Sequence, residues 1–385
     1  MTKSLAADWH AQLRRLSRVQ ARTETQVKSW LRRLDSLNPL TPSRPQDAPA
    51  RPRRSAVAPL TTPATPPAWS PARSPATSPI APDALPGTWQ AHRLRLAALP
   101  GELVPQLSYH LYIPSKRHRG PLPVVVLLHG CRQTPDALSA GTRMNALAEQ
   151  EGFIVAYPQQ PLRRQVQRCW QWFDLSAAEG GREAQALAAL LDALAARHDV
   201  REREIYLAGM SAGAAMAAVV ALRYPGKVAA VAMHSGVVIG AADTPRAGLH
   251  AMRHGATAEP AWLLDAAGVT PGGPEMPALV IHGLADDAVH PVNGRLLARQ
   301  FLAYNELEDR LAAIPDAGPD AAPGEEPGRC REYRFGRWSR DLVALVEVEG
   351  LDHAWSGGDA SYGFHSDIGP DASAMMWDFL RQHRR

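Results

Sequence analysis

Apolar, strand-like runs alternate with helix-like patterns from residue 89 to residue 381, and this alternation limits the folds that the chain can adopt. The expected strands are Trp89–Leu96, Ser108–Ile113, Val124–Leu128, Phe153–Tyr157, Ile205–Ala208, Val228–His234, Ala278–Ile281 and Leu342–Val348. The expected helices are Met144–Glu151, Arg182–Ala196, Ala212–Arg223, Asn293–Tyr304 and Ala372–Arg381. This order predicts an α/β fold with a mostly parallel central sheet and helices on both of its faces.

A glycine-flanked serine stands where one of these strands should meet a helix. The segment Gly209-Met210-Ser211-Ala212-Gly213 follows an apolar run and precedes a stretch of small residues. A strand, a tight turn and a helix in this order can thrust the serine outward as a nucleophile, and glycines are needed because side chains would collide across the turn. The dipole and free N–H groups of the helix would stabilise an oxyanion. The serine could instead simply cap the helix.

A serine nucleophile needs a base, and the base needs an acid that fixes its tautomer. In α/β-hydrolases the chain order is serine, acid, histidine. Asp286 and Asp287 both follow an expected strand, so both are candidates for the acid, and His353 follows the last long strand as the base. The histidines expected at surface or packing positions are His365, His290 and His234. The sequence thus predicts an α/β-hydrolase fold over residues 87–385 with Ser211 as nucleophile.

An oxyanion hole takes one N–H from the residue after the nucleophile, which here is Ala212. The second N–H usually comes from the loop after an early strand, and His129-Gly130-Cys131 follows such a strand. Glycine lets the backbone approach a substrate closely, so we expect the Cys131 N–H to be the second donor. His129 precedes the serine, which is out of order for the base, and we expect it to shape the turn.

The first 86 residues differ from the rest in composition and charge. Apolar residues three or four apart, with arginines among them, predict a basic amphipathic helix within residues 1–38. Fourteen prolines from Pro39 to Pro86 predict a disordered linker over residues 39–86. Residues 1–80 carry thirteen Lys and Arg against four Asp and Glu, so the basic balance belongs to this segment. The helix could pack on the domain or on a second copy, or bind an anionic membrane or a polymer granule.

Several classes of protein and partner are not expected. The three cysteines are too few for a disulfide framework and lack zinc-ligand spacing. We expect no metal and no cofactor. The N-terminus lacks the features of a secretory signal, and no run approaches the ~18 apolar residues of a membrane span, so a cytoplasmic location is expected. No aromatic and basic module for nucleic acid is recognisable. The sequence indicates no oligomeric state.

Five short stretches form a combined pattern. They are His129–Gln133, Cys169–Phe173, Gly209–Met216, His282–Val289 and His353–Gly358. Together and in this order they resemble the esterases related to polyhydroxybutyrate depolymerases, a family that includes feruloyl and acetylxylan esterases, over about residues 105–380. In that family the acid lies three residues before the valine, which selects Asp286 over Asp287. The resemblance implies a serine ester hydrolase that acts through an acyl-enzyme.

The resemblance also assigns residues to the substrate and to a disulfide. It implies that Trp170 or Trp172 lines the acyl pocket, although an aromatic cluster taken alone more often belongs to a core. It also implies that Cys169 can pair with Cys131. Further residues of these stretches expected at the substrate are His129, Gln133, Met210 and Trp355. We expect the weakly periodic segment Ile239–Pro277 to pass over the strand ends, where such folds place substrate-binding walls.

The expected substrate is polyhydroxybutyrate, its oligomers or a related short-chain ester. A feruloyl or acetylxylan ester is the alternative within the same chemistry, and a peptidase or thioesterase could use the same three residues. The chain could also belong to another functional class. It would then bind a granule or membrane surface and carry a weakly active hydrolase domain.

Overall fold

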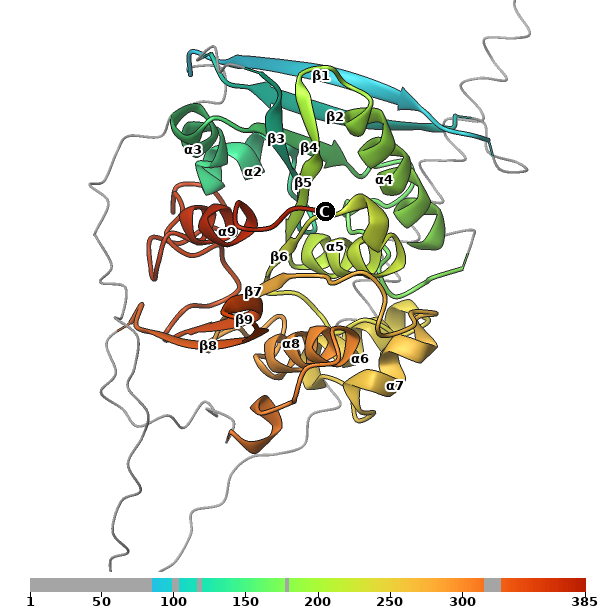
Figure 1. The fold of residues 1–385 in the computed structure, drawn as a ribbon, viewed down its shortest axis with the longest axis vertical. Helices are drawn as coiled ribbons and strands as arrows, with labels where there is room; N and C mark the ends of the chain where they lie inside the picture. Colours follow the sequence, from blue (N-terminus) through green and yellow to red (C-terminus); the bar gives the residue numbers. More distant parts are fainter. Residues whose placement is uncertain (1–84, 99–103, 116–119, 177–179, 315–326) are drawn as a thin grey trace, which may run out of the picture. The chain divides into compact units, whose positions relative to one another are not determined.

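The computed structural model describes residues 85–98, 104–115, 120–176, 180–314 and 327–385. These residues form one mixed β-sheet with helices on both faces (Figure 1). The expected basic helix and almost all of the expected linker lie outside the described residues. No helix within the described ranges is long and apolar enough to cross a membrane.

The sheet contains nine strands in the order β1-β2-β4-β3-β5-β6-β7-β9-β8. The strands are β1 Thr88–Arg95, β2 Gln106–Ile113, β3 Leu122–Leu128, β4 Ile154–Gln159, β5 Val200–Met210, β6 Val231–His234, β7 Ala278–Gly283, β8 Cys330–Arg337 and β9 Arg340–Val348. The pairs β1–β2, β2–β4 and β8–β9 are antiparallel, and the other pairs are parallel. Because the central strands are parallel, their carboxyl ends meet at one edge, where such sheets place their sites.

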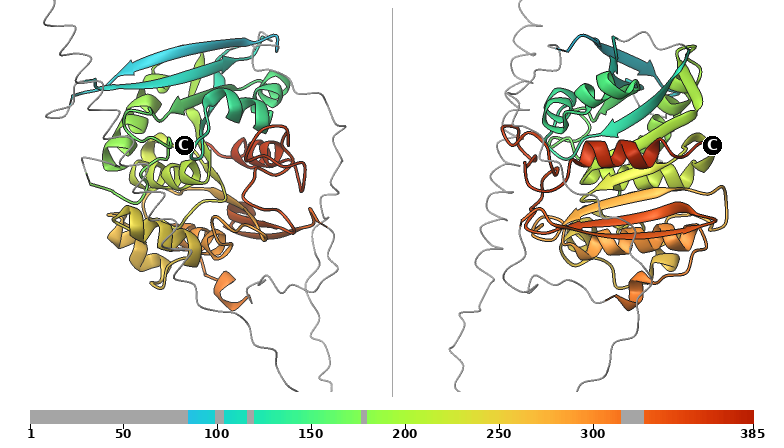
Figure 2. Two further views of the ribbon diagram at one scale, coloured as in Figure 1. Left: turned by 180° about the vertical axis from the view of Figure 1, so that it is seen from behind. Right: turned by 60° about the vertical axis from the view of Figure 1, so that its left-hand side comes forward.

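The helices form a layer on each face of the sheet. They are α2 Pro135–Thr142, α3 Met144–Glu151, α4 Gly180–Ala195, α5 Ala212–Arg223, α6 Pro245–His254, α7 Pro260–Ala266, α8 Val292–Tyr304 and α9 Ala372–Leu380, with the short 3₁₀ turns η1 Pro225–Lys227 and η2 Leu311–Ala313. Helices α4, α5 and α8 pack on one face, and α3 and α9 pack on the other (Figures 1 and 2).

Strand β3 shows how the sequence builds a core on each face. Val124 and Val126 point into the core beneath α4 and α5. Val125 and Leu127 point into the core beneath α3 and α9. A parallel strand that is buried on both faces reads as a continuous apolar run, which is how β3 was recognisable in the sequence.

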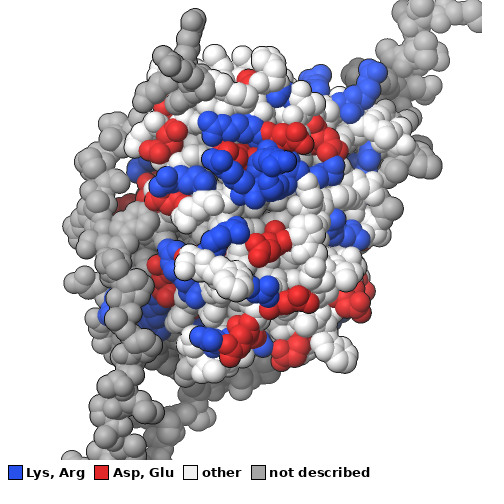
Figure 3. All heavy atoms as spheres, in the orientation of Figure 1, with Lys and Arg blue, Asp and Glu red and all other residues white. Residues whose placement is uncertain are grey.

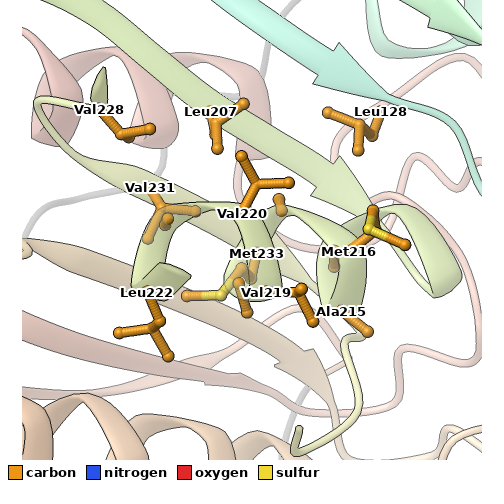
Figure 4. Close-up of a cluster of buried hydrophobic side chains, with 14 of the residues drawn as sticks. Leu128, Leu207, Ala215, Met216, Val219, Val220, Leu222, Val228, Val231 and Met233 are labelled. Carbon is orange, nitrogen blue, oxygen red and sulfur yellow. The ribbon is translucent and has the colours of Figure 1, made fainter. Parts of the chain in front are cut away.

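Helix α5 is rich in alanine and is buried along almost its whole length. Figure 4 shows Val219 and Val220 of this helix among Leu207 of β5 and Met233 of β6. Small side chains let the helix backbone lie close to the sheet, and the packing holds the helix start at the end of β5. The position of the β5–α5 turn is therefore set by the packing of a buried apolar core.

All eight expected strands and all five expected helices are present, and the ends of these helices agree within two residues. The segment Ile239–Pro277, expected only as an irregular excursion, contains α6 and α7 as well. Each begins with a proline at its first position, and the Thr244 hydroxyl caps α6. Hydrogen bonds from His290 and Asn293 to Met252 dock the end of α6 at the start of α8. Strand β8 and helix α2 were not expected either.

Candidate active site

Ser211 occupies a strained turn between β5 and α5. Its φ of 56° and ψ of −121° lie outside the regions that L-residues ordinarily adopt. A Cβ on Gly209 would lie 2.5 Å from the Gly213 carbonyl oxygen, and a Cβ on Gly213 would lie 2.3 Å from the Leu128 carbonyl oxygen. Both glycines are therefore required by close backbone approaches around the serine.

The Ser211 hydroxyl does not cap helix α5. It makes no cap hydrogen bond to the helix, and its Oγ lies 3.0 Å from His353 Nε2. Its backbone N–H donates to the His234 carbonyl oxygen at the end of β6, at 2.9 Å. The alternative that this serine simply caps the helix is therefore wrong.

His353 joins the serine to the acid. Its Nδ1 lies 2.7 Å from Asp286 Oδ2, and its Nε2 faces Ser211 Oγ. With a proton on Nδ1, the ring presents a lone pair on Nε2 to the serine hydroxyl. The structure thus brings together three side chains that lie 142 and 67 residues apart along the chain.

Asp286, and not Asp287, faces the histidine. Asp286 is buried, whereas Asp287 is exposed. Asp286 Oδ1 accepts hydrogen bonds from the backbone N–H groups of Ala288 at 3.0 Å and Val289 at 2.8 Å. Burial opposes ionisation, but the hydrogen bond and charge of His353 outweigh it and hold the pKa of Asp286 below its usual value. The valine three residues after the acid is Val289, and its N–H is one of the two groups that orient the Asp286 carboxylate.

His282 supports the acid loop, and the sequence reasoning had not singled it out. Its buried Nε2 donates to the Val289 carbonyl oxygen at 2.8 Å and lies 3.6 Å from Asp286 Oδ2. Burial lowers the pKa of His282, although Asp286 and the bond to Val289 act in the opposite direction. In the sequence this residue stands at the end of an apolar strand, directly before the acid loop, and it begins the stretch His282–Val289 that carries part of the family resemblance.

The loop after β3 lies against the nucleophile. A Cβ on Gly130 would lie 3.4 Å from Ser211 Cβ, so the backbone of this loop runs in van der Waals contact with the nucleophile. The Gly130 N–H is taken by Gln133 Oε1 at 2.7 Å. The N–H groups of Cys131 and Ala212, by contrast, have no hydrogen-bond acceptor among the described residues. Both can donate to an oxyanion, and their assignment to the oxyanion hole stays a prediction.

His129 and Gln133, which were expected at the substrate, make hydrogen bonds that stabilise the loop after β3. Fully buried His129 donates from Nδ1 to the Gly130 carbonyl oxygen at 2.8 Å and accepts the Gln160 N–H on Nε2 at 3.1 Å. Burial lowers its pKa to about 4, so the ring stays neutral. The indole N–H of Trp170 donates to the His129 carbonyl oxygen at 3.1 Å. Contact of these residues with substrate stays a prediction.

The other side chains expected at the substrate are members of the two cores. Trp170 and Trp172 belong to the core beneath α4 and α5, and Met210 and Trp355 belong to the core beneath α3 and α9. Each of the four exposes 3% of its surface or less. Such burial favours a role in positioning the catalytic loops, while their contact with substrate also stays a prediction.

Cys131 and Cys169 form a disulfide with their Cα atoms 4.2 Å apart. Next to it, the Arg132 N–H donates to the Gln167 carbonyl oxygen at 2.6 Å. The bond ties the oxyanion loop to the segment that carries Trp170, as the family resemblance implied. Cys330 is a free, exposed thiol.

The state of these cysteines in the native host reports where the protein works. We expect a trapped Cys131–Cys169 bond if that compartment is oxidising, and two alkylated thiols if it is the reducing cytoplasm. Cys330 should be alkylated in either case. Mass spectrometry of protein alkylated during lysis shows which of the three cysteines are bonded and which are free thiols. A bond between Cys330 and either partner would contradict the pairing.

A serine, a histidine and an aspartate hydrogen-bonded in a row at the carboxyl edge of a mostly parallel sheet define a hydrolase of the α/β-hydrolase class. The described residues contain no group of His, Cys, Asp and Glu side chains that could hold a metal ion.

The chain belongs to the esterase PHB depolymerase family, whose model matches residues 107–319. It is 33% identical over 237 residues to poly(3-hydroxyalkanoate) depolymerase C of Paucimonas lemoignei, a match that covers 60% of this chain and 54% of that protein. The chain thus spans about half the length of this relative. These matches confirm the family that the sequence pattern indicated.

Two acetylxylan esterases are also similar to the chain. The probable acetylxylan esterase A of Aspergillus clavatus is 29% identical over 278 residues, which cover 67% of this chain and 85% of that protein. The solved structure of an acetyl xylan esterase from Aspergillus awamori matches with a TM-score of 0.55 at 18% identity, covering 69% of this chain and 94% of that one. The structural match confirms the fold class.

Proposed function

We propose that the protein hydrolyses carboxylic esters through an acyl-enzyme formed on Ser211. The observation that carries this proposal is the hydrogen-bonded row from Ser211 through His353 to Asp286, beside two N–H groups that lack an acceptor in the described part of the chain. Membership of an esterase family supports an ester, rather than another acyl compound, as the substrate.

In the proposed reaction, Ser211 Oγ attacks the ester carbonyl carbon while its proton moves to His353 Nε2. The Asp286 carboxylate stabilises the imidazolium and stays ionised. The N–H groups of Cys131 and Ala212 donate to the oxyanion. His353 then protonates the departing alcohol, which leaves an ester on Ser211. Water attacks this ester as His353 takes its proton, and the acid is released with the serine hydroxyl restored.

The substrate that we propose is a hydroxyalkanoate polyester, its oligomers or a related short-chain ester. The family model and the depolymerase of Paucimonas lemoignei support this class. A carbohydrate ester such as acetylated xylan is the second candidate. The acetylxylan esterase of Aspergillus clavatus favours it, because that match covers more of the relative's length.

Initial rates on a panel of esters test the proposal. The panel contains p-nitrophenyl esters of increasing acyl length, hydroxybutyrate oligomers, the polymer, a feruloyl ester and acetylated xylan, with anilides and thioesters to detect peptidase or thioesterase activity. We expect the highest kcat/KM on hydroxybutyrate oligomers and short-chain esters. A higher value on acetylated xylan would select the second candidate, and purified protein that turns over no ester would reject the proposed function.

We further propose that residues 1–86 determine where the enzyme works rather than whether it works. The N-terminal charge motivates this proposal, since residues 1–80 carry thirteen Lys and Arg against four Asp and Glu. On the face of the domain drawn in Figure 3, basic and acidic side chains are interspersed. That face therefore offers no broad surface of one charge to an anionic partner.

Deleting residues 1–86 should leave kcat/KM on soluble short-chain esters within a few-fold of the full chain, because every residue of the proposed mechanism lies beyond Gly87. Sedimentation with anionic vesicles and with hydroxybutyrate granules should weaken. For vesicles the difference should shrink in high salt, since salt screens the arginines. A truncated protein that unfolds or loses soluble-ester activity would contradict the proposal and favour a segment that packs on the domain or on a second copy.

A further inference from the structure

His234 lies directly behind the reacting side chains and takes no part in the proposed reaction. It ends β6, the neighbour of β5 in the sheet. Its carbonyl oxygen accepts the Ser211 N–H at 2.9 Å, and its side chain is fully buried. The backbone of His234 thus fixes the start of the nucleophile turn.

The ring of His234 contacts the loop that carries the base. Its Nε2 accepts the backbone N–H of Ser356 at 3.2 Å, three residues after His353. Because Nε2 accepts, the ring proton is on Nδ1, which donates to Ser235 Oγ at 3.1 Å. The Ser356 hydroxyl lies 3.4 Å from Nε2, at the long end of the hydrogen-bond range.

The base loop is also bonded to other elements, among them the acid loop through the Ala285 N–H and the Leu351 carbonyl oxygen at 3.0 Å. Trp355 exchanges backbone hydrogen bonds with Phe364 and Ser366 at 2.9 Å, and its indole N–H donates to Ser373 Oγ of α9 at 3.2 Å. These bonds tie the loop to itself and to α9. The bond between His234 and Ser356 leads instead to the strand end that holds the nucleophile.

We propose that His234 is a positioning residue that keeps the base loop in register with the nucleophile turn, so that His353 Nε2 stays 3.0 Å from Ser211 Oγ. The carbonyl oxygen of His234 accepts the N–H of the nucleophile, and its ring accepts the N–H of Ser356 in the base loop, so one residue contacts both segments. The inference rests on the proposed esterase mechanism, because His234 acts through His353. A misplacement of reacting groups by about 1 Å can cost about 100-fold in rate.

The contact with Ser356 requires a neutral ring, because a protonated Nε2 cannot accept an N–H. Burial, together with the nearby His282 and His353, lowers the pKa of His234 to about 3, against the opposing effect of Asp286. The acceptor is therefore present throughout the neutral pH range.

Packing alone is the competing explanation for His234, since its ring stacks on Trp355 with centroids 5.3 Å apart and planes at 20°. Two substitutions separate the two roles. Phenylalanine keeps a flat ring but has no acceptor, whereas glutamine places an amide oxygen near the position of Nε2. Ser361→Ala is the control, because its hydroxyl lies on an exposed part of the same loop and bonds to Asp359 instead of His234.

The test compares kcat and KM for p-nitrophenyl butyrate, and the rate of fluorophosphonate labelling, in the full-length wild type and these variants. We expect His234→Phe to lower kcat and the labelling rate about 10- to 100-fold while KM stays within about two-fold. His234→Gln should recover both rates to within about five-fold of wild type, because the acceptor is restored. Ser361→Ala should match the wild type.

A His234→Phe enzyme with the kcat of wild type would overturn the inference. A His234→Gln enzyme as slow as His234→Phe would also overturn it, since lost stacking would then explain the effect. If His234→Phe does not fold, His234→Asn is compared with His234→Gln instead, because the asparagine side chain is too short to reach Ser356. We expect His234→Asn to have a lower kcat than His234→Gln. Equal kcat values would overturn the inference. A wild type that neither labels nor hydrolyses any ester would reject the proposed function, and this inference with it.

Discussion

Replacing Ser211 by alanine is expected to lower ester turnover by about 10⁴- to 10⁶-fold, the loss seen when members of such triads are removed. Without Oγ no acyl-enzyme forms, so only direct attack by water remains. The fold should persist, because alanine keeps the same Cβ in the turn and the hydroxyl makes no cap hydrogen bond to α5. Steady-state rates on a p-nitrophenyl ester, together with thermal unfolding, measure both effects.

Ser361→Ala serves as the control for this variant. Its hydroxyl donates to Asp359 Oδ1 at 2.6 Å on an exposed loop, so its loss should leave turnover unchanged. A fluorophosphonate should label the wild type and the control but not Ser211→Ala. A Ser211→Ala enzyme that retains a tenth of the wild-type rate would end the proposal of serine acylation.

The nucleophile turn could be predicted because its determinants are local in sequence. Two glycines, an apolar strand before them and small residues after them specify one strained turn, and each glycine is required by backbone within that turn or in the adjacent β3. Parallel strands were recognisable for a similar reason, since burial on both faces leaves continuous apolar runs such as Leu122–Leu128.

Strand β8 could not be predicted from apolar content. Its sequence, CREYRFGR, is rich in charge, and its exposed and half-buried residues alternate because it forms the edge of the sheet beside β9. Edge strands tolerate charged side chains, so a search for apolar runs misses them. Helices α2 and α6 carried a weaker signal, a threonine cap followed by proline, that was not used.

The members of the site could be predicted by their order along the chain, but their supporting contacts could not. Ser211, Asp286 and His353 follow a fixed chain order on a known fold. The bond from Ser356 to His234 joins residues 122 positions apart, and nothing local to either residue indicates it. The sequence reasoning accordingly placed His234 among surface or packing residues. It could anticipate a packing position for this residue, but not the hydrogen bond to Ser356.

The acid carries the second large expected effect. We expect Asp286→Asn to lower kcat by about 10⁴-fold, as in comparable triads, and Asp287→Asn to leave it within a few-fold. The pKa of Asp286 lies below its usual value, so the substitution removes a full negative charge at neutral pH. Asp287 is the matched control, since it is adjacent in sequence but exposed.

The size of the loss follows from the two backbone N–H groups that orient the acid. In Asp286→Asn, the amide oxygen should keep accepting from Ala288 and Val289, which turns the NH₂ group toward His353 Nδ1. His353 Nδ1 then has to accept a hydrogen bond from this NH₂ group, so the ring carries its single proton on Nε2 and cannot take the proton from Ser211. Steady-state kinetics of both variants at neutral pH, with thermal unfolding as a check on the fold, make the comparison. A larger loss in Asp287→Asn than in Asp286→Asn would show that the acid had been assigned to the wrong residue.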